Sequence, residues 1–228
     1  MSVSQLPAGE GALLFEEFLA VHTVVNRGAQ LVAGSFTRLA GGAAVDTKVL
    51  VTTAQWLVDS VRRHHRSGDE LLWPLLRERF PLAVRRLDRL TDDDDTLDEQ
   101  LVQLADVVAR MTEERAVGGS VGWGHAMREG TVASHQILDG LTRQLAAEGT
   151  LLEELFAKSP DEDVPGLRKA VAGALPRTGT HLVFGLLEHP EPVPGRERVH
   201  AGFPQRVRWS RGLLLNKFRK TLRELAAE

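Results

Sequence analysis

The sequence predicts an all-α protein: an up-down-up-down four-helix bundle followed by a C-terminal extension of short helices. Apolar residues recur at intervals of three and four over four long segments, which is the periodicity of helices with one buried face. Glycine and proline clusters separate these segments, and no stretch shows the alternating pattern of a strand. The 228 residues suffice for one bundle, expected over residues 1–158, and an extension over residues 159–228 that packs on it.

The first two helices of the bundle are expected over residues 13–33 and 47–65. One face of the first helix is formed by Leu14, Phe15, Phe18, Leu19, His22, Val25 and Ala29. Gly41 and Gly42 interrupt the helical pattern and indicate a turn. The second helix has its apolar residues on one side, at Val51, Ala54, Leu57, Val58 and Val61. Pro74 and Pro81 then delimit a short segment.

The third and fourth helices are expected over residues 92–115 and 131–158. Four consecutive aspartates, Asp92 to Asp95, begin the third helix, where the partial positive charge of a helix N-terminus favours acidic side chains. A glycine-rich stretch from Gly118 to Gly124, with Trp123 inside it, separates the two helices. It is either a surface linker or, because glycine makes a loop conformationally permissive, a lid over a pocket.

Residues 161–228 are expected to form short helices, because prolines between Pro160 and Pro204 repeatedly interrupt this part of the chain. Its last segment, RVRWSRGLLLNKFRKTLREL, is basic and amphipathic. We expect this segment to pack on the bundle rather than bind nucleic acid, since its leucines need burial and no aromatic side chains alternate with the charges for base stacking. An apolar stripe left exposed on it would also allow a homodimer.

The composition is that of an ordinary soluble globular protein, with 43% hydrophobic and 26% charged residues. A net charge of −3 gives no bulk attraction to nucleic acid or to an anionic membrane, and no apolar run approaches the roughly 20 residues that span a bilayer. The absence of cysteine excludes disulfides, thiolate metal sites and thiol nucleophiles. The N-terminus lacks the pattern of a secretory signal, so the expected location is the cytoplasm.

The most informative motif is HHRSGDELLWP, which runs from His64 to Pro74. A doubled histidine followed by acidic residues and by Leu-Trp-Pro resembles the second-helix signature of the hemerythrin-like HHE cation-binding domains. The resemblance covers most of the chain, including the tail of short helices with an Arg-rich end. It implies a four-helix bundle with a two-iron site at its centre.

The resemblance assigns the family's metal ligands to positions of this chain. Three ligands are kept: His22 in the first helix, His64 in the second and Glu148 in the fourth. The glutamate one turn after the first motif histidine is replaced by Gly68, the third-helix histidine by Asp94, and the fourth-helix histidine by Gln144. Two irons therefore lack ligands, whereas the three kept residues and Asp94 would suffice for one metal ion. A further pair, His125 and Glu129, lies at the edge of the glycine stretch, where a solvated loop histidine is the simpler interpretation.

Without iron, the centre of the bundle is expected to be a mostly apolar small-molecule pocket with a few polar groups. His22, His64 and Glu148 are the candidate catalytic residues, because a histidine paired with a buried carboxylate suits the role of general base. The expected substrate-binding residues are Phe15, Phe18, Trp56, Leu57, Val61, Gly68, Asp94, Gln144 and Leu145. Alternatively, the two histidines are relics that only satisfy buried polarity by bonding to Glu148.

Two main functions follow from these residues and the resemblance. The first is a cofactor-free enzyme of secondary metabolism that oxidises or dearomatises an aromatic, polyketide-like substrate, with dioxygen as a possible second substrate and Gln144 holding the substrate oxygen. The second is a non-haem iron protein that binds oxygen or nitric oxide. A regulatory domain with neither activity is a third. The cysteine-free composition, rich in Ala, Arg, Val and Asp, also resembles proteins of high-GC actinobacteria, where such pathways are common.

Overall fold

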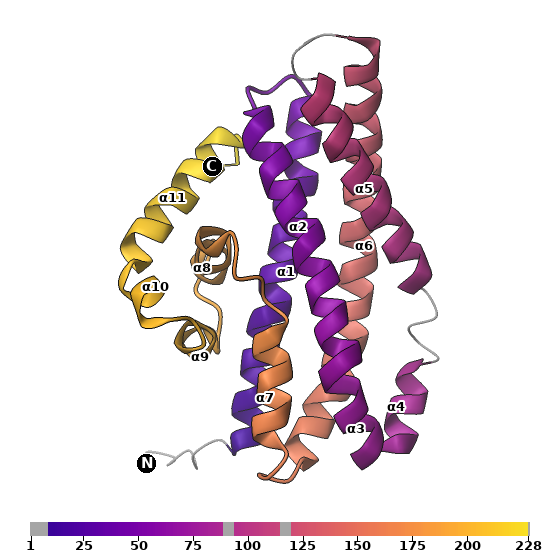
Figure 1. The fold of residues 1–228 in the computed structure, drawn as a ribbon, viewed down its shortest axis with the longest axis vertical. Helices are drawn as coiled ribbons and strands as arrows, with labels where there is room; N and C mark the ends of the chain where they lie inside the picture. Colours follow the sequence, from indigo (N-terminus) through magenta and orange to yellow (C-terminus); the bar gives the residue numbers. More distant parts are fainter. Residues whose placement is uncertain (1–8, 89–93, 115–119, 228) are drawn as a thin grey trace, which may run out of the picture.

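The computed structural model describes residues 9–88, 94–114 and 120–227, and all regular secondary structure in these ranges is helical (Figure 1). The predicted all-α class is therefore confirmed for this part of the chain. Four long helices lie side by side: α1 (Glu10–Ala40), α2 (Thr47–Ser67), α5 (Asp94–Glu114) and α6 (Val121–Lys158). α1 and α5 each contact both α2 and α6, so the four helices enclose a common core. None of the helices in the described ranges is long and apolar enough to cross a membrane.

The first turn between long helices lies where the sequence indicates it. α1 extends beyond the predicted range at both ends and stops at Gly41, and Gly42 has a φ of 84°, a left-handed conformation that glycine adopts without strain. Asp46 then caps α2, because its Oδ1 accepts hydrogen bonds from the backbone N–H groups of Lys48 (2.8 Å) and Val49 (3.2 Å).

The second helix ends two residues after the predicted end near His65, but the helical path does not stop there. α2 continues through a π-helical turn, η1 (Gly68–Leu72), into α3 (Trp73–Arg79), and α4 (Pro81–Asp88) follows. In η1 the backbone N–H of Trp73 donates to the carbonyl of Gly68, five residues earlier, which widens the helix and changes the residues that face inward. Pro74 does not interrupt this path because it lies in the first turn of α3, where its missing N–H is not needed.

The predicted start of the fourth helix at residue 131 is wrong, because α6 already begins at Val121. Ser120 caps this end by accepting a hydrogen bond from the Trp123 backbone N–H at 2.9 Å. Gly122 and Gly124 therefore lie within the first helical turns, although glycine disfavours a helix by about 1 kcal/mol per residue. The cap, worth about 1 kcal/mol, and the packing of Trp123 on the core offset that cost.

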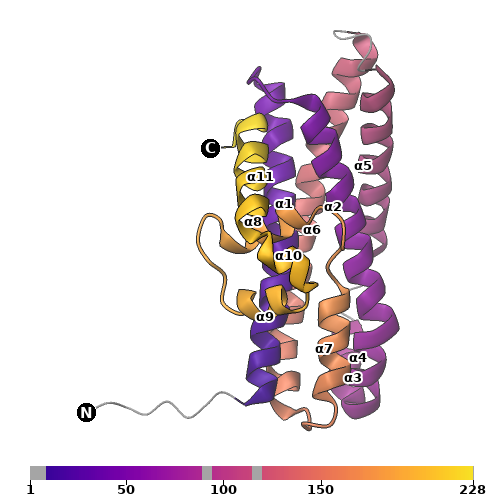
Figure 2. The same cartoon turned by 60° about the vertical axis from the view of Figure 1, so that its left-hand side comes forward.

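The C-terminal part forms five short helices: α7 (Val164–Gly173), α8 (Thr180–Glu188), α9 (Arg196–Ala201), α10 (Gln205–Trp209) and α11 (Arg211–Glu224). α7 lies against α1, α2 and η1, and α8 and α9 lie against α1 (Figures 1 and 2). α11 packs on α8, where the Phe218 ring lies against Gly185, and Leu222 is buried, but Leu213 is 73% exposed. The expected burial of the leucines in this basic segment is therefore only partly met.

Candidate functional site

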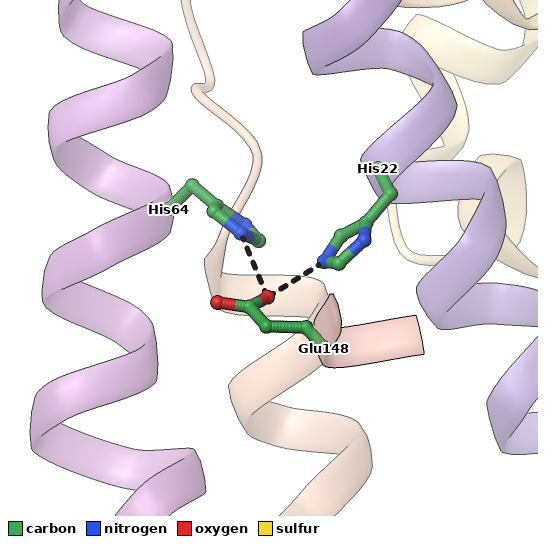
Figure 3. A group of neighbouring side chains, drawn as sticks. All are labelled: His22, His64 and Glu148. Atoms are coloured by element: carbon green, nitrogen blue, oxygen red, sulfur yellow. Dashed lines mark ion pairs between the residues drawn. The ribbon is translucent and has the colours of Figure 1, made fainter. Parts of the chain in front are cut away.

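Three buried polar side chains from three helices converge inside the core (Figure 3). His22 comes from α1, His64 from α2 and Glu148 from α6. The Nε2 atoms of His22 and His64 lie 3.4 Å and 3.9 Å from the same oxygen, Oε2 of Glu148. The sequence analysis singled out these three residues, and the structure brings them together although they are separated by up to 126 positions along the chain.

Helical spacing places each of these side chains. Phe18 precedes His22 by one turn on the buried face of α1, and the two rings are in contact, with centroids 3.7 Å apart. The His22 and His64 rings meet edge to face, with centroids 4.9 Å apart. On α6, Gln144 lies one turn before Glu148 and donates from Nε2 to Glu148 Oε1 at 3.1 Å. Only Oε2 of Glu148 therefore remains directed at the two histidines.

Burial controls the protonation of this group. It lowers the pKa of His22 to about 3, and it lowers the pKa of His64 to about 3 with the help of the neighbouring His22, while Glu148 opposes this shift. Burial also raises the pKa of Glu148, against the effect of His64. Both imidazoles are therefore neutral near pH 7. The expected near-neutral pKa of these histidines is not found, and an imidazole with a pKa near 3 is a weak base.

Neutral imidazole is, however, the form that binds metal ions. Both ring nitrogens of His22 and Nδ1 of His64 are buried without a hydrogen-bond partner, and the three donor atoms lie within 4.8 Å of one another. Atoms that bind one zinc or iron ion at about 2.1 Å each lie roughly 3 to 3.5 Å apart, so the spacing fits one ion after a small contraction. Neither Nδ1 has the acceptor that usually orients a metal-bound histidine, which lowers the expected affinity.

A second group of possible ligands in the described ranges consists of Glu188, Glu197 and His200. Two arginines already pair with its carboxylates: Arg196 lies 3.4 Å from Glu188 and 3.5 Å from Glu197, and Arg211 also pairs with Glu188. Their positive charges disfavour a cation there. We interpret this group as an ion-pair cluster that links α8, α9 and α11.

A cavity of about 170 Å³ adjoins the three converging residues. Its polar lining consists of His64, His65, Ser67, Asp69, Arg77, Asp98, Gln144 and Glu148. Its remaining lining consists of Phe18, Val21, Gly68, Leu72, Trp73, Ala170, Val171 and Ala174. The last three belong to or follow α7, so the C-terminal extension completes one wall of the cavity.

Three of the predicted substrate-binding residues, Phe18, Gly68 and Gln144, line the cavity. Four others lie elsewhere in the structure. Leu57, Val61 and Leu145 are buried in the packed core, and Trp56 packs against Gly28 and Gly179. None of the four lines the cavity, so this part of the prediction is wrong. Their burial was predicted correctly, but a buried side chain can face a neighbouring helix instead of open space.

Three further predictions concern residues outside this lining. Phe15 stacks on Phe18, with ring centroids 6.2 Å apart, but does not line the cavity. The side chain of Asp94 lies outside the part of the chain that the structure describes, so its proposed ligand role is not placed. His125 is exposed and lies in α6, not in a loop, and Glu129 pairs with Arg110.

The lid prediction for Gly118 to Gly124 is wrong for the described residues of this stretch. Residues 118 and 119 are not described, and residues 121–124 belong to the first turns of α6. Glu148 is 27 positions further along this helix, which corresponds to about 40 Å at 1.5 Å per residue. A segment at this end of α6 cannot cover the cavity.

Sequence reasoning missed several residues of the site. His65 stands beside His64 in the motif, and its Nδ1 lies 3.7 Å from Oδ1 of Asp98 on α5. The motif contained Asp69 and Trp73 as well, but an unbroken α-helix would have turned Asp69 away. The α7 residues gave no signal, because nothing in their sequence shows which part of the other helices they cover.

Comparison with models of protein families, with curated proteins and with solved structures finds no match to this chain in any of the three.

Proposed function

We propose that the protein binds one divalent transition-metal ion through His22, His64 and Glu148. The convergence of three buried donor atoms, which includes imidazole nitrogens without a partner, supports this proposal. Two histidines and one carboxylate with open positions are typical of non-haem iron sites, and the same donors also suit zinc. A bound iron would supply a position for a small ligand such as dioxygen or nitric oxide.

The proposal includes a relation to the hemerythrin-like HHE domains. The four long helices would be the family's four-helix bundle, with residues 159–228 packed on it. The kept residues of the motif and the three converging ligands support this relation. We propose one ion instead of two, because Gly68 provides no carboxylate and the amide of Gln144 is engaged with Glu148.

Elemental analysis tests the metal proposal directly. Protein stripped with EDTA and reloaded with Fe(II) or Co(II) without oxygen is expected to hold one ion per chain. His64→Ala should lose the ion, whereas His125→Ala, which changes an exposed histidine on α6, should keep it. Two ions per chain, no ion, or full loading of His64→Ala would contradict the proposal.

A second candidate function is a metal-free enzyme, which the adjoining cavity favours. A small aromatic substrate with a hydroxyl group would lie in the cavity. The raised pKa of Glu148 makes it a better proton acceptor than the two histidines. Oxidation of a dihydric phenol to a quinone would release two electrons and two protons, which dioxygen would accept as hydrogen peroxide.

Oxygen uptake tests this second candidate. Metal-free protein in excess EDTA is expected to accelerate oxygen consumption with hydroquinone, and Glu148→Gln should remove the acceleration. Peroxide should form in equal amount to the oxygen consumed. Uptake equal to that of buffer alone, or uptake that requires added iron, would exclude a metal-free enzyme acting on this substrate.

A further inference from the structure

Three residues that line the cavity have a buried polar atom without a hydrogen-bond partner: Nδ1 of His64, Nε2 of His65 and Oε1 of Gln144. The last two atoms belong to residues outside the converging group of three. Neither atom belongs to the three converging donors, so a metal ion bound there would leave both unsatisfied. An unsatisfied buried polar atom costs about 1–3 kcal/mol, and native proteins usually supply a partner. A ligand in the cavity is the natural source of both partners.

The surroundings of these atoms define what the ligand must offer. The amide of Gln144 is oriented by its other end, since its Nε2 donates to Glu148, which leaves Oε1 as an acceptor that needs a donor. The Nδ1 of His65 faces Asp98, with its Oδ1 3.7 Å away, and Nε2 is the ring nitrogen without a partner. A hydroxyl group suits both positions, because it donates to an amide oxygen and can donate to or accept from an imidazole nitrogen.

The rest of the lining limits the size and the charge of the ligand. Phe18 and Trp73 provide aromatic walls. The volume of about 170 Å³ is close to the 150 Å³ of an engineered apolar cavity that binds benzene, so one aromatic ring fits. Three acidic residues and one arginine line the cavity, which disfavours a ligand with a carboxylate or phosphate.

We propose that the cavity binds an uncharged, single-ring aromatic molecule with two hydroxyl groups, one placed at His65 and the other at Gln144. This inference deepens the second candidate function and rests on it only in assuming that the cavity takes a small molecule. It requires neither turnover nor a bound metal. It also narrows the predicted substrate class from aromatic, polyketide-like molecules to dihydroxybenzenes.

A ligand series on the unmodified protein tests the inference without any variant. Catechol, resorcinol, hydroquinone, phenol and toluene would be titrated into EDTA-treated protein without oxygen, with affinities measured by calorimetry or by ligand-observed NMR. The best dihydroxybenzene is expected to bind at least about tenfold more tightly than phenol, and toluene should bind most weakly. Equal binding of toluene or phenol, or no binding by any of the five, would overturn the inference.

A matched pair of variants assigns the contact. Gln144→Met keeps the side-chain length and removes the acceptor, so the best dihydroxybenzene should bind about tenfold more weakly while toluene binds as before. Gln136→Met changes an exposed glutamine on the same helix and should alter neither affinity. Unchanged dihydroxybenzene binding by a folded Gln144→Met protein counts against the inference. If the protein loads metal normally but binds none of the ligands, only this inference is refuted and the metal proposal stands. If the protein binds the ligand but does not accelerate oxygen uptake, only the proposed enzyme activity is refuted.

Discussion

The buried histidines predict a specific dependence of stability on pH in the metal-free protein. The pKa of His22 and that of His64 are lowered from 6.5 to about 3 in the folded state, whereas unfolding returns both to their ordinary value. Between these values the unfolded chain binds more protons than the folded chain. The free energy of unfolding therefore falls as the pH is lowered through 6.5 towards 3.

The size of this effect follows from the linkage relation. One pKa unit corresponds to 1.36 kcal/mol, and half of each histidine is already protonated in the unfolded chain at pH 6.5, so lowering the pH from 6.5 to 5 costs about 1.6 kcal/mol for each histidine. Glu148 acts in the opposite direction, because its raised pKa lets the folded state bind a proton that the unfolded state binds only at lower pH. A Glu148→Gln variant removes this opposing contribution, and it should lose about 3 kcal/mol over the same interval.

Urea unfolding in the presence of EDTA, followed by circular dichroism at pH 7.5, 6.5, 5.8 and 5, measures this loss. The control is the triple variant His22→Leu, His64→Leu and Glu148→Gln, in which His181 and His200 still titrate as in the single variant. The single variant should lose about 3 kcal/mol more than the control between pH 6.5 and 5. Equal slopes for the two variants would refute the conclusion that both imidazoles are buried and neutral.

Two further predictions concern packing. A Cβ at Gly185 would overlap the ring of Phe218, so Gly185→Ala should lower the free energy of unfolding by about 1–3 kcal/mol. The control is Gly149→Ala, whose Cβ meets no atom within 4 Å. This control should leave the free energy of unfolding unchanged or raise it by up to about 1 kcal/mol. Equal melting temperatures for the two variants would contradict the packing of α11 on α8. Ala170→Leu places a larger side chain in the cavity wall, so it should abolish dihydroxybenzene binding. Metal loading of this variant should stay at the level of the unmodified protein. Unchanged ligand affinity would show that α7 is not part of the binding site.

The sequence allowed the helical class and the three converging residues to be predicted for a physical reason. Helical periodicity identifies the buried face of each long segment, and a histidine or glutamate on that face must point into the core. His22, His64 and Glu148 lie on such faces, and the structure brings them together. The start of α6 was missed because two glycines outweighed the serine cap in the sequence pattern, although the cap and the partly buried Trp123 stabilise this end of the helix.

The walls of the cavity could not be predicted in the same way. Periodicity shows that Leu57 and Val61 are buried, but it cannot show that they face tightly packed neighbours while Val21 and Leu72 face open space. That difference depends on how helices distant in the sequence fit together. Ala170 illustrates the limit, because it becomes part of the cavity only through the position of α7 against η1.

The side chain of Trp73 lies beside Gly68, where the π-helical turn begins. Gly68 keeps the regular α-helical relation to His64, because its backbone N–H donates to the His64 carbonyl, so position 68 points to about the same side of the helix as His64. Here a Cβ at Gly68 would lie 3.2 Å from Nε1 of Trp73, which means that the indole already occupies the space next to this backbone. Gly68 and Trp73 therefore act as a pair: the glycine gives the indole room, and the indole forms a wall of the cavity. The cavity wall at this point therefore depends on two residues of one motif, and it adjoins the three converging donors.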